Sequence, residues 1–172
     1  MIAVLLAALA LQTSAPSSWA GPAPADDRAG VVAEPAARAA AATLDRMHAA
    51  ASQADGAAYF DQFAPGARFI GTDASEHWDL AQFRAYADPI FAQGKGWTYH
   101  PRDRSLSVSG DIAWFDEKLD HDAYGELRGS GVLRRYGPGE TWKIEQYVLS
   151  FAVPNDRADA VVDLIRDPAE AP

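Results

Sequence analysis

The stretch from Asp111 to Phe151 most constrains the fold, because it predicts three consecutive antiparallel strands. Polar segments at residues 120–123 and 137–140 separate the three runs. A meander of this kind buries one face and needs other elements to cover it. The positions that suit such a half-buried pleated surface are β-branched or aromatic: Trp114, Phe115, Val132, Leu133, Trp142, Ile144, Tyr147 and Phe151.

Helical patterns upstream of the meander predict the covering layer. Apolar residues, mostly alanine, recur three or four positions apart from Pro35 until Asp55-Gly56, which predicts a helix with one apolar face. Asp79 and Gln82 form a capping-box pair at the start of a second helix, which Pro89 should kink or end. The remaining predicted elements are a short helical turn at 57–63, a brief strand at 68–70, strands at 97–109, 112–119, 124–136 and 142–153, and a last helix at 156–166.

The composition predicts one folded domain with an acidic surface. Hydrophobic residues make up 48% of the 172 residues, and five are tryptophan, which argues against disorder. The formal net charge of −9 disfavours nucleic acid and anionic membranes as partners, since both attract basic patches. The chain contains no cysteine, which excludes disulfides and a thiol nucleophile.

The N-terminal sequence favours export over the alternative of a disordered or buried apolar N-terminus. Residues 2–11 form an uninterrupted apolar run that is too short to span a bilayer and matches the core of a signal peptide. Small-x-small patterns that signal peptidase cleaves end at Ala15 and Ala20. We therefore divide the chain into a signal peptide (1–20), a flexible linker (21–34), the folded domain (35–155) and a C-terminal helix and tail (156–172). The processed protein is expected in the periplasm or outside the cell, with no membrane attachment.

Four local strings resemble the SnoaL-like (polyketide-cyclase-like) branch of the nuclear transport factor 2-like superfamily: FIGTDASEHW, AWFDEKLD, YGELRGSGVL and WKIEQYVLSFAVPN. The resemblance covers residues 35–155, and the last string is its most specific part. It implies an α+β, cystatin-like fold in which N-terminal helices wrap a curved, mostly antiparallel sheet into a cone with an open mouth. The chain departs from the family at Val148, where a histidine or asparagine often stands, so a common polar group of the pocket is absent there.

The resemblance implies two classes of function. Members of the family are isomerases, dehydratases, epoxide hydrolases, cyclases, or plain ligand-binding and protein-binding domains, so the fold does not decide between them. In one reading, the cone binds a small, mostly apolar molecule, with or without acid–base catalysis. In the other, side chains fill the cone and the protein is a scaffold or accessory protein that acts through its sheet face. The resemblance also implies a homodimer packed through the sheet.

Strand alternation divides the central block into two faces. The second face, which carries Phe115, Leu127 and Tyr147, is continuously apolar except for Glu117 and two glycines. The first face mixes large apolar residues with isolated polar ones, as ligand pockets do, and is expected to line the pocket, although the pattern leaves the reverse assignment open. The first face comprises Trp114, Asp116, Arg128, Ser130, Val132, Trp142, Ile144, Gln146, Val148 and Ser150.

Asp116 is the candidate catalytic residue on that first face. Burial of a carboxylate in an apolar cone raises its pKa, which suits a general base or a neutral hydrogen-bond donor. The alternative is that Asp116 pairs with Arg128 across two strands and only stabilises the sheet. Pocket-lining roles are expected for Trp114, Arg128, Ser130, Gln146 and Ser150 of the same face.

The loop after the first predicted strand would lie at the mouth of the cone. It carries Asp73 and His77, which are candidates for the pocket, and Trp78, which should anchor the loop on the core. His48 lies on an apolar helix face and is interpreted as a packed core residue. The sequence contains no metal-ligand motif and no glycine-rich phosphate loop, so neither a metal nor a cofactor is expected.

Overall fold

The computed structural model describes residues 27–137 and 141–166. The predicted signal peptide lies outside these residues. Helix α1 (Asp27–Ser52) already begins within the range that the sequence analysis assigned to a flexible linker, so residues 27–34 are helical. The helix extends past Pro35 and ends at Ser52, near the predicted end at Asp55.

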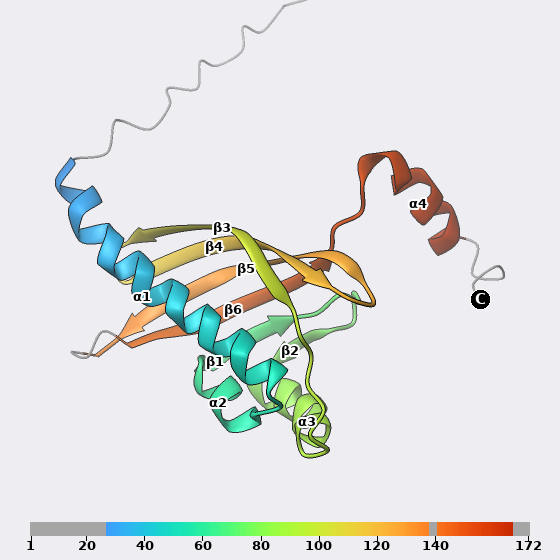
Figure 1. The fold of residues 1–172 in the computed structure, drawn as a ribbon, viewed down its shortest axis with the longest axis horizontal. Coiled ribbons are helices and arrows are strands. Elements are labelled where there is room, and N and C mark those ends of the chain that lie inside the picture. Colours follow the sequence, from blue (N-terminus) through green and yellow to red (C-terminus); the bar gives the residue numbers. More distant parts are fainter. Residues whose placement is uncertain (1–26, 138–140, 167–172) are drawn as a thin grey trace, which may run out of the picture.

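One six-stranded sheet organises the chain, in the order β2-β1-β6-β5-β4-β3 (Figure 1). The long strands are β3 (His100–Ser109), β4 (Ile112–His121), β5 (Gly125–Tyr136) and β6 (Thr141–Phe151), and all pair antiparallel. Strand β1 (Phe63–Ile70) pairs parallel with β6 and antiparallel with the short β2 (His77–Asp79). This mostly antiparallel sheet with helices on one side confirms the α+β prediction.

Three helices cover one face of the sheet. Helix α1 crosses it diagonally, and α2 (Gly56–Asp61) and α3 (Leu80–Phe91) lie at the end that carries β1 and β2 (Figure 1). Asp79 caps α3 through the predicted capping box with Gln82. Helix α3 continues through Pro89 and ends two residues later, at Phe91. The core between the layers includes Leu44, Tyr59, Phe83, Leu133 and Ile144, all at most 2% exposed.

The element bounds follow the sequence predictions with a few differences. The four long strands begin or end within three residues of the predicted positions. The brief strand expected at 68–70 is longer, since β1 begins at Phe63 and continues through Pro65. The terminal helix is split into a 3-10 turn, η1 (Asn155–Arg157), and α4 (Ala158–Arg166).

Two irregularities in the sheet change which side chains share a face. In β6 an extra residue, Glu145, shifts the register between Ile144 and Gln146. As a result Trp142 and Ile144 are buried on the same side as Tyr147, whereas uninterrupted alternation assigned them to the opposite face. In β3 a second register shift surrounds Asp103, whose φ is 48°. A bulge changes the direction of the side chains that follow it, and here it turns the Arg104 side chain toward α1.

Gly131 provides a test of how tightly β5 and β6 pack. A Cβ atom at this position would lie 2.0 Å from the Gln146 carbonyl oxygen, which is backbone and cannot rotate away. We expect Gly131→Ala to lower the free energy of unfolding by about 2–3 kcal/mol, as overpacking does. The matched control is Gly66→Ala in β1, where a Cβ would meet nothing within 4 Å and the change should be neutral or slightly stabilising. Urea denaturation of both variants measures the difference, and equal stabilities would contradict the close approach.

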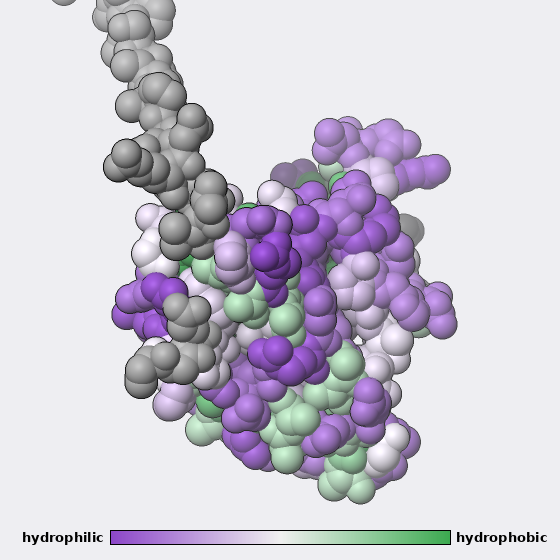
Figure 2. Space-filling model, turned by 60° about the vertical axis from the view of Figure 1, so that its left-hand side comes forward, coloured by the Kyte–Doolittle hydropathy of each residue, from purple (hydrophilic) through white to green (hydrophobic). Residues whose placement is uncertain are grey.

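Helix α4 stands apart from the layered body at the end of β6 (Figure 1). None of its residues is buried, and Leu164 and Ile165 are exposed. Figure 2 shows the molecule with the left-hand side of Figure 1 turned forward. On this side, hydrophobic residues are dispersed among hydrophilic ones. Within the described ranges, no helix is both long enough and apolar enough to cross a bilayer.

Candidate functional site

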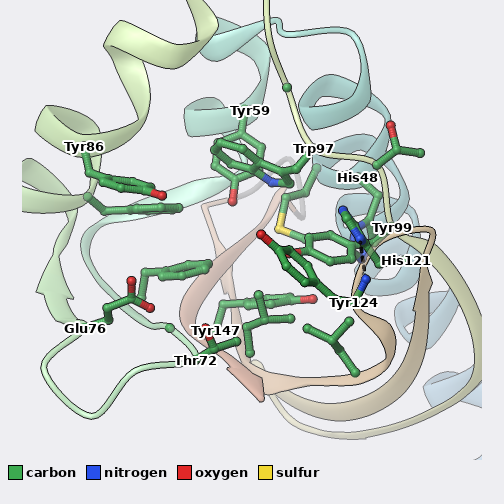
Figure 3. Close-up of a pocket in the computed structure, with 18 of the residues that line it drawn as sticks. His48, Tyr59, Thr72, Glu76, Tyr86, Trp97, Tyr99, His121, Tyr124 and Tyr147 are labelled. Carbon is green, nitrogen blue, oxygen red and sulfur yellow. Dashed lines mark hydrogen bonds between the residues drawn. The ribbon is translucent and has the colours of Figure 1, made fainter. Parts of the chain in front are cut away.

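An open cavity of about 680 Å³ lies between the helix-covered face of the sheet and the loops near the C-terminal end of β6. Its lining comes from helices α1, α2 and α3, from strands β1, β2, β4, β5 and β6, and from the loop between β1 and β2, the segment before β3 and the turn between β4 and β5. Figure 3 shows aromatic rings on several sides of the open space, with Glu76 and Thr72 at one end. The lining residues with polar side-chain atoms are His48, Tyr59, Thr72, Glu76, Trp78, Tyr86, Trp97, Thr98, Tyr99, His121, Asp122, Tyr124 and Tyr147.

Stacked rings form one wall of the cavity. Phe69 of β1 lies parallel to Phe83 of α3, with ring centroids 3.9 Å apart, and to Tyr147 of β6 at 5.8 Å. Trp78 continues the stack toward Tyr86, at 5.0 Å. Such pairs add to the stability gained by burial, so this wall is a rigid apolar surface against which a flat ligand can stack.

The turn between β4 and β5 forms the opposite side. His121 stacks on Tyr124 with centroids 4.6 Å apart and lies 5.2 Å from Tyr99. Its Nδ1 accepts hydrogen bonds from the backbone N–H groups of Ala123 and Tyr124, at 3.1 and 3.3 Å. The His121 ring therefore serves to hold the turn that borders the cavity.

A buried polar cluster lies behind the cavity, centred on Glu117 of β4. The Glu117 side chain is 0% exposed. Its Oε1 accepts hydrogen bonds from His48 Nε2 at 2.7 Å and from the Tyr147 hydroxyl at 3.2 Å. Its Oε2 accepts one from Arg104 Nε at 2.7 Å. Arg104 in turn donates to Asp45 Oδ1 at 2.7 Å and to the Ala41 carbonyl at 3.2 Å, both on α1. The cluster thus joins α1, β3, β4 and β6.

The cluster holds Glu117 in its ionised form. Burial by itself raises the pKa of a carboxylate, but the hydrogen bond from His48, together with the charge and hydrogen bond of the Arg104 guanidinium, outweighs it and brings the pKa of Glu117 below its ordinary value of 4.5. Burial, and the adjacent Glu117 carboxylate, raise the pKa of Tyr147 well above 10, so its hydroxyl keeps its proton and donates.

The ionised state of Glu117 fixes the orientation of His48. A carboxylate only accepts hydrogen bonds, so the His48 Nε2 must carry the proton in their 2.7 Å contact. In neutral His48 the lone pair is then on Nδ1. No described residue hydrogen-bonds to Nδ1, and His48 lines the cavity. A histidine oriented by a buried carboxylate, with its second nitrogen free for a ligand, is the arrangement of a general base.

The residues that sequence alternation expected to line the pocket lie on the other face of the sheet. Asp116 is exposed there, and it is opposite Ser130 rather than Arg128 in the register. No ion pair joins Asp116 to Arg128 among the described residues, because Arg128 is opposite Lys118. Trp114, Arg128, Ser130, Gln146 and Ser150 share this outer face, so none of them is part of the cavity lining. The alternative left open by the sequence, that the second face lines the pocket, is the one that the structure adopts.

The three loop candidates have different positions. Trp78 is part of the cavity wall. Asp73 is exposed and its Oδ1 accepts hydrogen bonds from the backbone and hydroxyl of Ser75, which lower its pKa and stabilise the loop. His77 is exposed in β2 and does not line the cavity.

His48, Glu117 and Arg104 are the residues of this site that the sequence analysis did not select. Glu117 was noticed only as an exception on an apolar face, and His48 was interpreted as core packing. A buried carboxylate requires a partner, and a lone histidine on a covering helix is a natural one, so the two exceptions together carried a signal. Arg104 carried none, because only the bulge at Asp103 brings it inward.

No group of three or more potential metal ligands occurs within residues 27–137 and 141–166. In the structure Asp120 pairs with Arg102, with Nε to Oδ2 at 2.8 Å.

Comparisons with known proteins agree with this geometry. The family model described as "SnoaL-like domain" matches residues 40–154. No curated protein sequence matches the chain. Similar solved structures include a nuclear transport factor 2-like protein of unknown function from Pseudomonas putida, with a TM-score of 0.60, 13% identity, and coverage of 72% of this chain and 91% of that one.

Two further structures carry names that suggest chemistry. A candidate ketosteroid isomerase from Shewanella frigidimarina has a TM-score of 0.53 and 19% identity, covering 65% of this chain and 94% of that one. A candidate dehydratase of the nuclear transport factor 2-like family from Streptomyces avermitilis has a TM-score of 0.60 and 13% identity, covering 70% and 99%. At these identities the likeness shows a common fold.

Proposed function

Because the chain belongs to the SnoaL-like domain family, we propose that it binds a small, mostly apolar molecule in its cavity and performs acid–base chemistry on it, of the isomerase or dehydratase type. The observation that carries the proposal is an open cavity walled by aromatic rings, with the free Nδ1 of a carboxylate-oriented histidine at its lining. The names of the two structural neighbours, an isomerase and a dehydratase, suggest the same type of reaction.

The size and lining of the cavity support a ligand. Its volume of about 680 Å³ falls within the range of about 300–1,000 Å³ typical of small-molecule sites. The stacked wall of Phe69, Trp78 and Phe83 suits a flat apolar body. A scaffold whose cone is filled by its own side chains would lack this space, so the cavity favours the binding function over that alternative.

The proposed chemistry assigns a proton acceptor and a hydrogen-bond donor. His48 Nδ1 takes a proton from the bound molecule, and ionised Glu117 stabilises the imidazolium that results. Burial, followed by the proximity of Tyr124, Tyr86 and Glu76, raises the pKa of Tyr99 to about 12. Tyr99 therefore stays neutral and can donate its hydroxyl hydrogen to an oxygen on which negative charge develops.

Ligand binding is tested by thermal shift and calorimetry with 2-naphthalenemethanol, a flat, neutral and mostly apolar probe. The melting temperature should rise with probe concentration, and at 100 times Kd the gain in stability should be about 2.7 kcal/mol. Leu149→Trp should abolish the effect, because Leu149 lines the cavity. Val148→Trp places the same ring on the outer face and should leave binding intact. No shift for the natural chain, or equal loss in both variants, would contradict the proposal.

We also propose that the protein is exported and that it forms a homodimer through the outer face of the sheet. The apolar run at residues 2–11 supports export, and mass spectrometry of protein from its native host should find an N-terminus that follows Ala15 or Ala20. Trp114, 49% exposed on the outer face, supports the dimer. Trp114→Lys should then convert a dimer to a monomer in sedimentation, while a monomeric natural chain would contradict this assembly.

A further inference from the structure

The charged groups around the cavity are unbalanced. Glu76 and Asp122 contribute carboxylates to the lining, and His48 and His121 contribute imidazoles. Neither lysine nor arginine occurs among the described residues that line it. The nearest guanidinium of the polar cluster, that of Arg104, is already paired with Glu117 and Asp45. An anionic ligand would therefore find no strong cation at the site.

Glu76 has one carboxylate oxygen available. It lies in the loop between β1 and β2, where its Oε2 accepts the backbone N–H of Asp73 at 3.2 Å. A side chain at Gly71 would collide with Glu76, since a Cβ there would be 2.0 Å from Oε2. The close approach of this glycine holds the carboxylate against the loop. Oε1 accepts no hydrogen bond from a described residue, and Figure 3 shows Glu76 at one end of the cavity near Tyr86.

Electron-rich aromatic rings line the same cavity. Trp78 and Tyr86 stack with centroids 5.0 Å apart, and Trp97 and Tyr99 also line the cavity. Aromatic faces attract cations, and most strongly where water is excluded. Burial raises the pKa of Tyr99 most. Tyr124, Tyr86 and the Glu76 carboxylate raise it further, because they disfavour a phenolate anion at this position. Burial disfavours a charge of either sign, but the Glu76 carboxylate repels an anion and attracts a cation.

We infer that the ligand carries a cationic group, such as an alkylammonium, that is seated between Glu76 and the rings of Trp78 and Tyr86, with its apolar body deeper in the cavity. This inference rests on the proposed function, since it names the ligand class of the same cavity. The acidic net charge of −9 adds a general attraction of cationic molecules to the protein.

Three naphthalene probes of one size and different charge test the inference by calorimetry at pH 7. They are 2-naphthalenemethylamine (cationic), 2-naphthalenemethanol (neutral) and 2-naphthoate (anionic). The amine should bind most tightly and the carboxylate most weakly. Glu76→Gln keeps an oxygen for the Asp73 N–H but removes the charge, so it should weaken the amine about fivefold, as the loss of a part-exposed ion pair does, and leave the alcohol unchanged. Asp163→Asn, which removes the same charge from α4 outside the cavity lining, is the matched control.

The outcomes separate this inference from the proposed function. Equal affinity for amine and alcohol, or tightest binding of naphthoate, would overturn the cationic ligand while leaving a functional pocket. The same loss of amine affinity in Asp163→Asn as in Glu76→Gln would also overturn it, because the effect would then come from net charge. If none of the three probes binds, the proposed function fails and this inference fails with it.

Discussion

Replacement of Glu117 by Gln should lower the free energy of unfolding by about 3–5 kcal/mol, because it removes the charge that compensates the buried side of Arg104. It also disturbs the hydrogen bonds from His48 and Tyr147. The matched control is the preceding residue: Asp116→Asn makes the same chemical change on the exposed outer face and should alter stability by less than about 0.5 kcal/mol. Urea denaturation at pH 7 measures both values.

The pH dependence of stability gives the same prediction a second measurement. The pKa of Glu117 is lowered in the folded protein, so its contribution is complete above the unfolded-state value near 4.5 and is lost as the pH falls through the folded-state value. The natural chain should therefore lose stability in acid more steeply than Glu117→Gln, and the two curves should converge at low pH. Parallel curves, or equal small effects of the Glu117 and Asp116 changes, would show that the cluster does not stabilise the fold.

Replacement of His48 by Gln should remove most of the proton-abstracting capacity of the cavity. A general test is the elimination of 5-nitrobenzisoxazole, a flat neutral molecule: the base takes the C3 proton, the N–O bond breaks, and the coloured 2-cyano-4-nitrophenolate forms. If His48 Nδ1 is the base, His48→Gln should reduce the rate about 100-fold, at the lower end of the range for general bases. A Gln amide can still donate to Glu117, so the fold should be kept.

Two carboxylates of the lining provide the competing explanation. Glu76→Gln and Asp122→Asn each remove a carboxylate from the cavity lining and should change this rate by less than about twofold, since neither is oriented by a buried partner. A large loss in either carboxylate variant, with little loss in His48→Gln, would assign the base to that carboxylate.

The order and type of the elements, and the antiparallel pairing of the last three strands, could be predicted from local patterns, whereas the exact register of the strands could not. The capping box at Asp79 and the aromatic strands after Asp111 depend on residues that are neighbours in sequence, so local patterns predict them. The β6 bulge at Glu145 depends on how two strands pack. An extra residue reverses the alternation, and so Trp142 and Ile144 appeared to share a face with Gln146 although they are buried on the opposite side.

The candidate site could be predicted only in part for the same reason. Strand alternation separated Asp116 from Glu117 correctly, but a face with isolated polar residues resembles both a pocket and a solvated sheet surface. The contact between His48 and Glu117 joins residues 69 positions apart, and the contact between Arg104 and Asp45 joins residues 59 apart. Such contacts follow from the placement of α1 across the sheet, which no local pattern specifies.

Four tryptophans allow the central claim, a ligand cavity on the inner face of the sheet, to be measured in one experiment. Trp78 and Trp97 line the cavity, Trp114 is on the outer face, and Trp142 is buried in the core outside the lining. In a 1H–15N NMR titration with 2-naphthalenemethanol, the indole signals of Trp78 and Trp97 should shift together with one saturable Kd, while those of Trp114 and Trp142 stay in place. A saturable shift of Trp114 without Trp78 and Trp97, or no shift at all, would contradict the account.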